Sequence, residues 1–126
     1  NNISFNLFTF EEKFSSFIKD ANLCITRAGA STLSELTFLN IPYIAIPYQA
    51  AKDNHQFENA LFYENKNCCW IFNQKDLKSD LLFNFLEKII KDKDDYFTKK
   101  KNMKELSNNN SWNKINQKLI NVLNEN

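Results

Sequence analysis

An unbroken apolar run between two prolines sets the fold class of this chain. Residues 43–46 read Tyr-Ile-Ala-Ile, and Pro42 and Pro47 flank them. So short a run is typical of a strand, and the absence of polar alternation indicates that both of its faces are buried. Strands of this kind lie inside parallel sheets that helices cover on both sides. The run therefore predicts an α/β fold.

The segments on either side of this run alternate between strand and helix patterns. Apolar or alternating runs predict strands over 3–7, 22–26, 43–46 and 68–72. Apolar residues at helical spacing predict helices over 11–19, 30–39, from Asp53 as N-cap through Leu61, 75–91, 94–107 and from Trp112 onward. Elements in this order form right-handed crossovers. We therefore expect a Rossmann-like parallel sheet with helices on both faces.

Length and charge exclude several classes of protein. The 126 residues favour a single domain over 1–126. Lys and Arg number 16 against 15 Asp and Glu, a net charge of +1 that provides no electrostatic basis for binding nucleic acid. No apolar run reaches the roughly 18 residues that cross a bilayer. Because the sequence begins with Asn1 rather than Met, we expect it to be part of a longer protein.

The cysteines and carboxylates predict no metal site and no cofactor. Cys24, Cys68 and Cys69 are odd in number and lack the spacing of zinc ligands, which favours a reducing cytoplasm. The carboxylates do not cluster in the way that a dedicated metal site requires.

The single glycine of the chain, Gly29, is more informative than the cysteines. A chain of this length usually holds about nine glycines, and this one holds only Gly29. Such a glycine is expected at a positive φ or where the backbone approaches a neighbour closely.

A polar segment containing this glycine follows the predicted strand over 22–26. It reads Thr26-Arg27-Ala28-Gly29-Ala30-Ser31-Thr32-Leu33-Ser34-Glu35. Small side chains at a helix start leave its backbone N–H groups open to an anion, and the helix dipole adds to the attraction. A diphosphate would fit there. Two alternatives remain: Thr32 and Glu35 match a capping box, which the pattern alone favours, and Arg27 could be a structural salt-bridge partner.

A second polar segment follows the strand over 43–46. Gln56 and Asn59 share one helix face, and amides beside His55 suit the recognition of sugar hydroxyls. Asp53 and Gln56 also match a capping box, and a lone histidine is more often a surface residue than a catalyst.

Together these residues resemble a known family. Residues 21–36 resemble the donor-site signature of the peptidoglycan glycosyltransferase family MurG, and residues 41–42, 46–48 and 53–60 recur there at matching intervals. The resemblance covers nearly the whole chain and corresponds to the C-terminal half of the family. It implies a UDP-sugar-binding domain of the glycosyltransferase family 28 C-terminal type, one half of a GT-B enzyme whose N-terminal acceptor domain is absent from this sequence.

The resemblance also implies an activity. The family transfers N-acetylglucosamine from UDP-N-acetylglucosamine to the lipid-linked acceptor lipid I, with inversion, on the cytoplasmic face of the inner membrane. The general base belongs to the N-terminal domain, so no catalytic residue is expected in this chain. An isolated half would expose its former interface, which would permit weak self-association. Two alternatives are another GT-B enzyme, such as a UDP-sugar 2-epimerase, and a non-catalytic UDP-sugar-binding subunit with a separate membrane partner.

Carried over by position, the resemblance assigns binding roles to individual residues. It places Arg27 against the uracil and makes Glu35 the acceptor for the ribose hydroxyls. Gln56, His55 and Asn59 meet the sugar. Ala30, Ser31 and Thr32 offer backbone and hydroxyl donors to the diphosphate, and the predicted substrate-binding residues of the same segment also include Gly29, Leu33 and Ser34. The backbone of Glu11 would read the uracil edge, although the family usually has an apolar residue at that position.

Overall fold

A small parallel sheet forms the centre of the molecule. The computed structural model describes residues 4–7, 9, 12–110 and 112–124. The three strands are β1 (Cys24–Thr26), β2 (Tyr43–Ala45) and β3 (Trp70–Ile71), in the order β1-β2-β3. Cys24 pairs with Tyr43, and Ile44 pairs with Trp70, both in parallel register. The predicted strands over 22–26, 43–46 and 68–72 are confirmed, although each is shorter than its apolar run.

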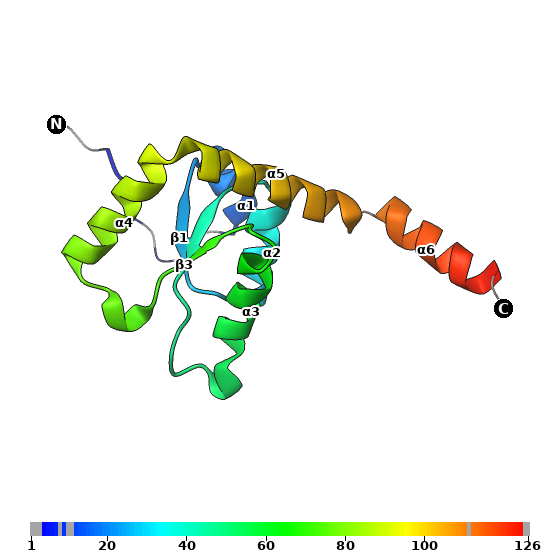
Figure 1. Cartoon of the computed structure of the whole chain (residues 1–126), viewed down its shortest axis with the longest axis horizontal. Helices are drawn as coiled ribbons and strands as arrows, with labels where there is room; N and C mark the ends of the chain where they lie inside the picture. Colours follow the sequence, from blue (N-terminus) through cyan, green and yellow to red (C-terminus); the bar gives the residue numbers. More distant parts are fainter. Residues whose placement is uncertain (1–3, 8, 10–11, 111, 125–126) are drawn as a thin grey trace.

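One helix precedes β1, and the other helices follow the strands. They are α1 (Phe14–Ile18), α2 (Ala30–Phe38), α3 (His55–Glu64), α4 (Ser79–Lys91), α5 (Lys93–Asn109) and α6 (Trp112–Asn124), with short 3₁₀ helices η1 (Lys52–Asn54) and η2 (Gln74–Asp76). Figure 1 shows α5 crossing from α4 to α2, and α6 extending away from the sheet. Exposed apolar side chains on α6 include Leu123, which is 74% exposed.

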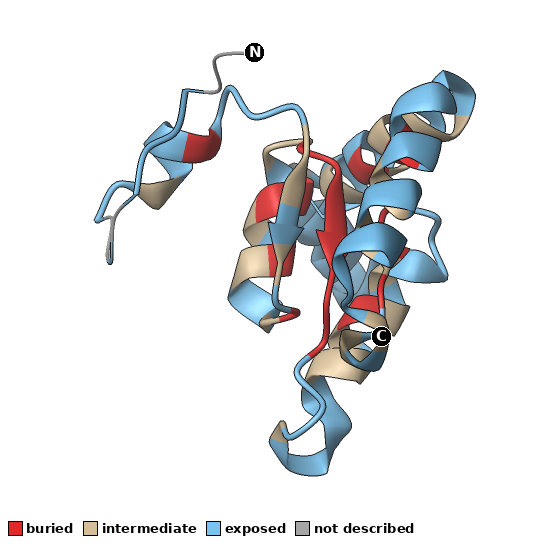
Figure 2. Ribbon diagram, turned by 90° about the vertical axis from the view of Figure 1, so that its left-hand side faces the viewer, coloured by how far each residue is buried: buried red, intermediate tan, exposed pale blue. Residues whose placement is uncertain are grey.

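Both faces of the sheet are covered, as predicted. Tyr43 and Ala45 of β2 face one cluster, whose helical members are Ile18 of α1, Leu33 and Leu36 of α2, Ala60 of α3 and Met103 of α5. The alternate residues Ile44 and Ile46 face a second cluster with Trp70, Phe72 and Ile89 of α4. Buried residues therefore fill the central strand β2, between the helical layers, whereas the edge strand β1 is only partly buried (Figure 2). The Rossmann-like α/β class is confirmed.

The N-terminal segment departs from its prediction. Residues 4–7 form no strand, and Phe5 and Leu7 are 81% and 92% exposed. An alternating segment becomes a strand only where it finds a partner, and within the described residues β1 pairs with β2 alone. The helix expected over 11–19 is reduced to the five residues of α1. Glu11, with its predicted backbone role, lies outside the described residues.

The predicted N-cap of the helix after β2 is also wrong. Asp53 lies inside η1 with a φ of 53°, and Asn54 occupies the cap position with a φ of 57°. Asp and Asn tolerate this left-handed region better than most residues. These two successive left-handed residues change the direction of the backbone before α3 begins at His55.

A buried polar network joins β3 to α5. Lys99 is 5% exposed, and its Nζ donates to Asn67 Oδ1 at 2.7 Å and to Asp95 Oδ1 at 3.1 Å. The other carboxylate oxygen of Asp95 accepts from Trp70 Nε1 at 2.8 Å. Burial raises the pKa of Asp95, but the hydrogen bonds from Trp70 and Lys99 outweigh it, and the net pKa is below its usual value. The Nζ of Lys99 also lies over the Trp70 ring, 4.8 Å from its centroid.

Candidate functional site

Two loops at the carboxyl ends of β1 and β2 are fastened to one helix. Gln56 Oε1 of α3 accepts from the backbone N–H of Ala28 at 3.2 Å and of Tyr48 at 2.9 Å. Asn59 Nδ2, one turn along α3, donates to the carbonyl of Ala28 at 3.0 Å. These two amide side chains, which the sequence predicted to meet a sugar, hold the two loops in place. Because Gln56 bonds to these loops, its interpretation as a capping-box residue is wrong.

The first turn of α2 faces the same edge of the sheet. The helix begins at Ala30, and its N-cap is Gly29, which forms no side-chain cap. The first N–H groups of a helix have no intrahelical partner and can receive an anion. The side chains of Ala30 and Ser31 are exposed, whereas that of Leu33 is fully buried in the core. Leu33 can therefore contribute only its backbone to a ligand.

Gly29 does not have the positive φ that its rarity suggested. Its φ is −66° and its ψ is 136°, which any residue can adopt. A Cβ added there would lie 4.0 Å from Thr32 Oγ1, which is ordinary van der Waals contact. The fold therefore does not require glycine at this position. The prediction that a ligand approaches the backbone closely at Gly29 is not tested by these contacts.

Glu35 does not belong to a capping box. Thr32, the proposed cap, lies inside α2, two residues after its start at Ala30. The partly exposed carboxylate of Glu35 instead accepts from the hydroxyl of Ser15 on α1. Glu35 is thus placed beside the segment that precedes β1, with a structural partner of its own.

Arg27 reaches across the edge of the sheet. Its Nη1 donates to Gln74 Oε1 at 2.8 Å and lies 3.4 Å from the carbonyl oxygen of Ile46. Its guanidinium carbon is 5.5 Å from the centroid of the Tyr48 ring. In the part of the chain that the structure describes, Arg27 forms no salt bridge, so these neutral groups are its partners.

Two contacts of Arg27, Tyr48 and Gln74, line a small cavity. It has a volume of about 230 Å³ and is lined by Pro47, Tyr48, Gln49, Asn54, Phe57, Asn73 and Gln74. Gln74 was not among the residues predicted for the site. The position of Gln74 just after the third strand was the signal that could have identified it, since ligands of parallel sheets bind at the carboxyl ends of strands.

The side chain of His55 takes no part in the hydrogen bonds that hold the two loops. Its side chain is 71% exposed, and its nearest charged neighbour is Asp53, with Nε2 and Oδ2 3.8 Å apart. It lies on the same helix as Gln56 but does not share the hydrogen bonds that fasten the loops.

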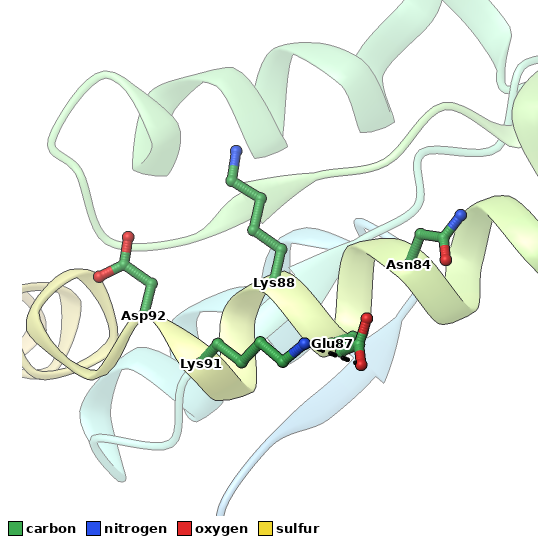
Figure 3. A pocket seen from close by; sticks show the side chains of 5 residues that line it. All are labelled: Asn84, Glu87, Lys88, Lys91 and Asp92. Atoms are coloured by element: carbon green, nitrogen blue, oxygen red, sulfur yellow. Dashed lines mark ion pairs between the residues drawn. The ribbon is translucent and has the colours of Figure 1, made fainter.

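A larger hollow lies elsewhere, over α4. It has a volume of about 550 Å³ and is lined by Asn84, Glu87, Lys88, Lys91 and Asp92. Figure 3 shows that these side chains fan out in different directions, with Lys91 turned toward Glu87, 2.9 Å away. None of the predicted site residues borders it. Because its polar groups do not converge, this hollow is not the candidate site.

In the part of the chain that the structure describes, potential metal ligands do not cluster, and burial raises the pKa values of the thiols. Among the described residues, no group of three or more His, Cys, Asp or Glu is placed to hold a metal ion. Burial raises the pKa of Cys69 to about 12, and it also raises the pKa values of Cys24 and Cys68. These thiols are protonated at neutral pH.

In the same described part of the chain, no helix has both the length and the hydrophobicity to span a membrane.

Comparison with known proteins identifies the family. The model of the glycosyltransferase family 28 C-terminal domain matches residues 1–118. A protein of Pelagibacter ubique is 52% identical over 125 residues, which cover 99% of this chain and 35% of the relative. A protein of Helicobacter pylori is 38% identical over 102 residues, covering 81% of this chain and 28% of the relative.

Both relatives carry the name UDP-N-acetylglucosamine–N-acetylmuramyl-(pentapeptide) pyrophosphoryl-undecaprenol N-acetylglucosamine transferase. The chain thus spans about a third of the length of these relatives. The predicted resemblance to the MurG family is confirmed, and the chain belongs to the family of glycosyltransferase family 28 C-terminal domains.

Proposed function

We propose that this chain is the donor-binding domain of an inverting N-acetylglucosaminyltransferase that forms lipid II at the cytoplasmic face of the inner membrane. The observation that carries the proposal is that the start of α2, Arg27 and the two loops held by Gln56 all lie at the carboxyl-terminal edge of the sheet. There, the uncapped start of α2 lies beside Arg27 and the loops that Gln56 fastens. The names of the relatives support transfer of N-acetylglucosamine over epimerisation of a UDP-sugar.

The proposed roles divide the donor along this edge. The N–H groups at the start of α2, with the hydroxyls of Ser31 and Thr32, bind the diphosphate. Glu35 accepts from the ribose hydroxyls, and Arg27 lies against the uracil. Gln56 and Asn59 each use one amide atom to hold the loops, which leaves the Nε2 of Gln56 and the Oδ1 of Asn59 to meet the sugar. The helix dipole at α2 also stabilises charge on the departing diphosphate.

Calorimetric titration of the chain with UDP-N-acetylglucosamine, UDP and UDP-glucose tests the proposal. We expect UDP-N-acetylglucosamine to bind, UDP to bind through the shared nucleotide, and ADP, as a matched control, to bind much more weakly. Equal affinity for ADP and UDP would contradict a uridine site. Because the chain spans only about a third of the length of these relatives, we expect no lipid II formation by the chain alone.

Substitution of Gly29 separates ligand approach from protein stability. Gly29→Ala should change the free energy of unfolding by less than about 1 kcal/mol, because the φ of −66° suits alanine but alanine is a weaker N-cap than glycine. Gly29→Val places a larger side chain where the diphosphate would approach and should abolish UDP binding. Thermal unfolding and titration of both variants measure the two effects. Unchanged UDP affinity in Gly29→Val would show that the diphosphate does not approach here.

A further inference from the structure

We propose that Gln74 is a positioning residue that holds the guanidinium of Arg27 in place for UDP binding. This inference rests on the proposed function, and it adds a residue of the third strand's loop to the donor site. No predicted role covered Gln74, which lies in η2 and lines the 230 Å³ cavity.

The contacts of Arg27 span the whole width of the sheet. Arg27 itself comes directly after β1, Ile46 directly after β2, and Gln74 three residues after β3. One guanidinium nitrogen, Nη1, lies within 3.4 Å of the Ile46 carbonyl and 2.8 Å of the Gln74 side chain. The Arg27 side chain therefore depends on all three strand ends for its place, and Gln74 supplies the shorter of the two contacts.

A neutral partner leaves the arginine charge available. A carboxylate in place of the Gln74 amide would pair with the guanidinium and offset its charge, whereas an amide oxygen fixes its direction without doing so. Arginine has five N–H donors in one plane, so fixing Nη1 orients the others. An exposed arginine held this way also loses less side-chain freedom when a ligand binds. The geometry suits a residue that must meet an anionic, planar ligand.

The first test reads the guanidinium directly. Arg27 is the only arginine in the chain, so its side-chain ¹⁵N NMR signals need no assignment. In the unsubstituted chain without ligand we expect hindered rotation of the guanidinium, seen as separate Nη signals. Gln74→Met, which keeps the length but loses the acceptor, should average these signals, and Lys75→Met in the same 3₁₀ helix should not. Identical spectra for Gln74→Met and the unsubstituted chain would overturn the proposal.

The second test is a double-mutant cycle on UDP affinity. We expect Gln74→Met to weaken UDP binding about tenfold in the unsubstituted chain but less than about twofold in Arg27→Ala, since the two residues act as a unit. Gln74→Asn, whose amide is one methylene short of Arg27, should behave like Gln74→Met and serves if the latter folds poorly. Equal losses in both backgrounds would overturn the proposal.

The two tests distinguish this inference from the proposed function. Failure of the unsubstituted chain to bind UDP, with separate Nη signals that Gln74→Met averages, would overturn the donor site and the role of Gln74 in it while confirming the contact. UDP binding with an additive cycle would overturn the inference alone.

Discussion

Glu35→Ala should weaken UDP binding by about 2–4 kcal/mol, because a carboxylate makes stronger hydrogen bonds than a neutral acceptor and the ribose hydroxyls would be left unpaired. Glu35→Gln retains the size of the side chain but loses the charge. It should weaken binding clearly while the melting temperature barely changes. Titration with UDP and thermal unfolding of both variants measure the two effects.

The contact between Glu35 and Ser15 calls for a control. Ser15→Ala removes the hydroxyl that donates to Glu35 and leaves the carboxylate intact. If Glu35 binds the ribose, Ser15→Ala should change UDP affinity far less than Glu35→Ala. If Glu35 serves only to attach α1 to α2, the two substitutions should have similar, small effects on affinity and similar effects on stability. The second pattern would contradict the proposed ribose contact.

In the network beneath Trp70, removing the charge of Asp95 should destabilise the fold much more than removing the charge of Lys99. Asp95→Asn leaves the cation of Lys99, which is 5% exposed, without its anionic partner, and should lower the free energy of unfolding by about 2 kcal/mol. Lys99→Met removes the buried charge and leaves the more exposed carboxylate, so it should be close to neutral. Urea denaturation at pH 7 compares the variants, and a greater loss in Lys99→Met would contradict this account.

The same network predicts a pH dependence. The folded-state pKa of Asp95 is below its usual value, so the carboxylate stabilises the fold above the unfolded-state pKa of about 3.9. This contribution is lost as the pH falls through the lower, folded-state pKa. The stability difference between the unsubstituted chain and Asp95→Asn should therefore be full near pH 7 and shrink below about pH 4. A difference that stays constant down to pH 2 would rule this out.

The pattern of apolar residues predicted the central strand and its covering helices correctly, because these elements are set by which residues are buried. The run over 43–46 became the central strand, and helices cover both of its faces. The alternation over 3–7 failed for the complementary reason: a strand also needs a neighbouring edge, which no single segment of sequence reveals. Residues 4–7 have the pattern without the partner.

The capping boxes failed because the motif does not fix its own position along the chain. The spacing of Thr32 and Glu35 is correct for a cap, but α2 begins two residues before Thr32. Gln56 likewise has the correct spacing from Asp53, yet its acceptor serves the Ala28 and Tyr48 amides from other loops. Sequence placed Gln56 at the site, and only the tertiary arrangement shows what it bonds to. Gln74 was missed because its partner, Arg27, is 47 residues away in the chain.

The double acceptor at Gln56 limits how this domain could be re-engineered. One oxygen serves the loop after β1 and the loop after β2, so neither loop is an independent module. A grafted loop that moved the Ala28 amide would leave a buried donor unsatisfied, and replacing Gln56 would disturb both loops at once. The smallest segment that can be exchanged between related domains with its connections intact is therefore both loops together with α3.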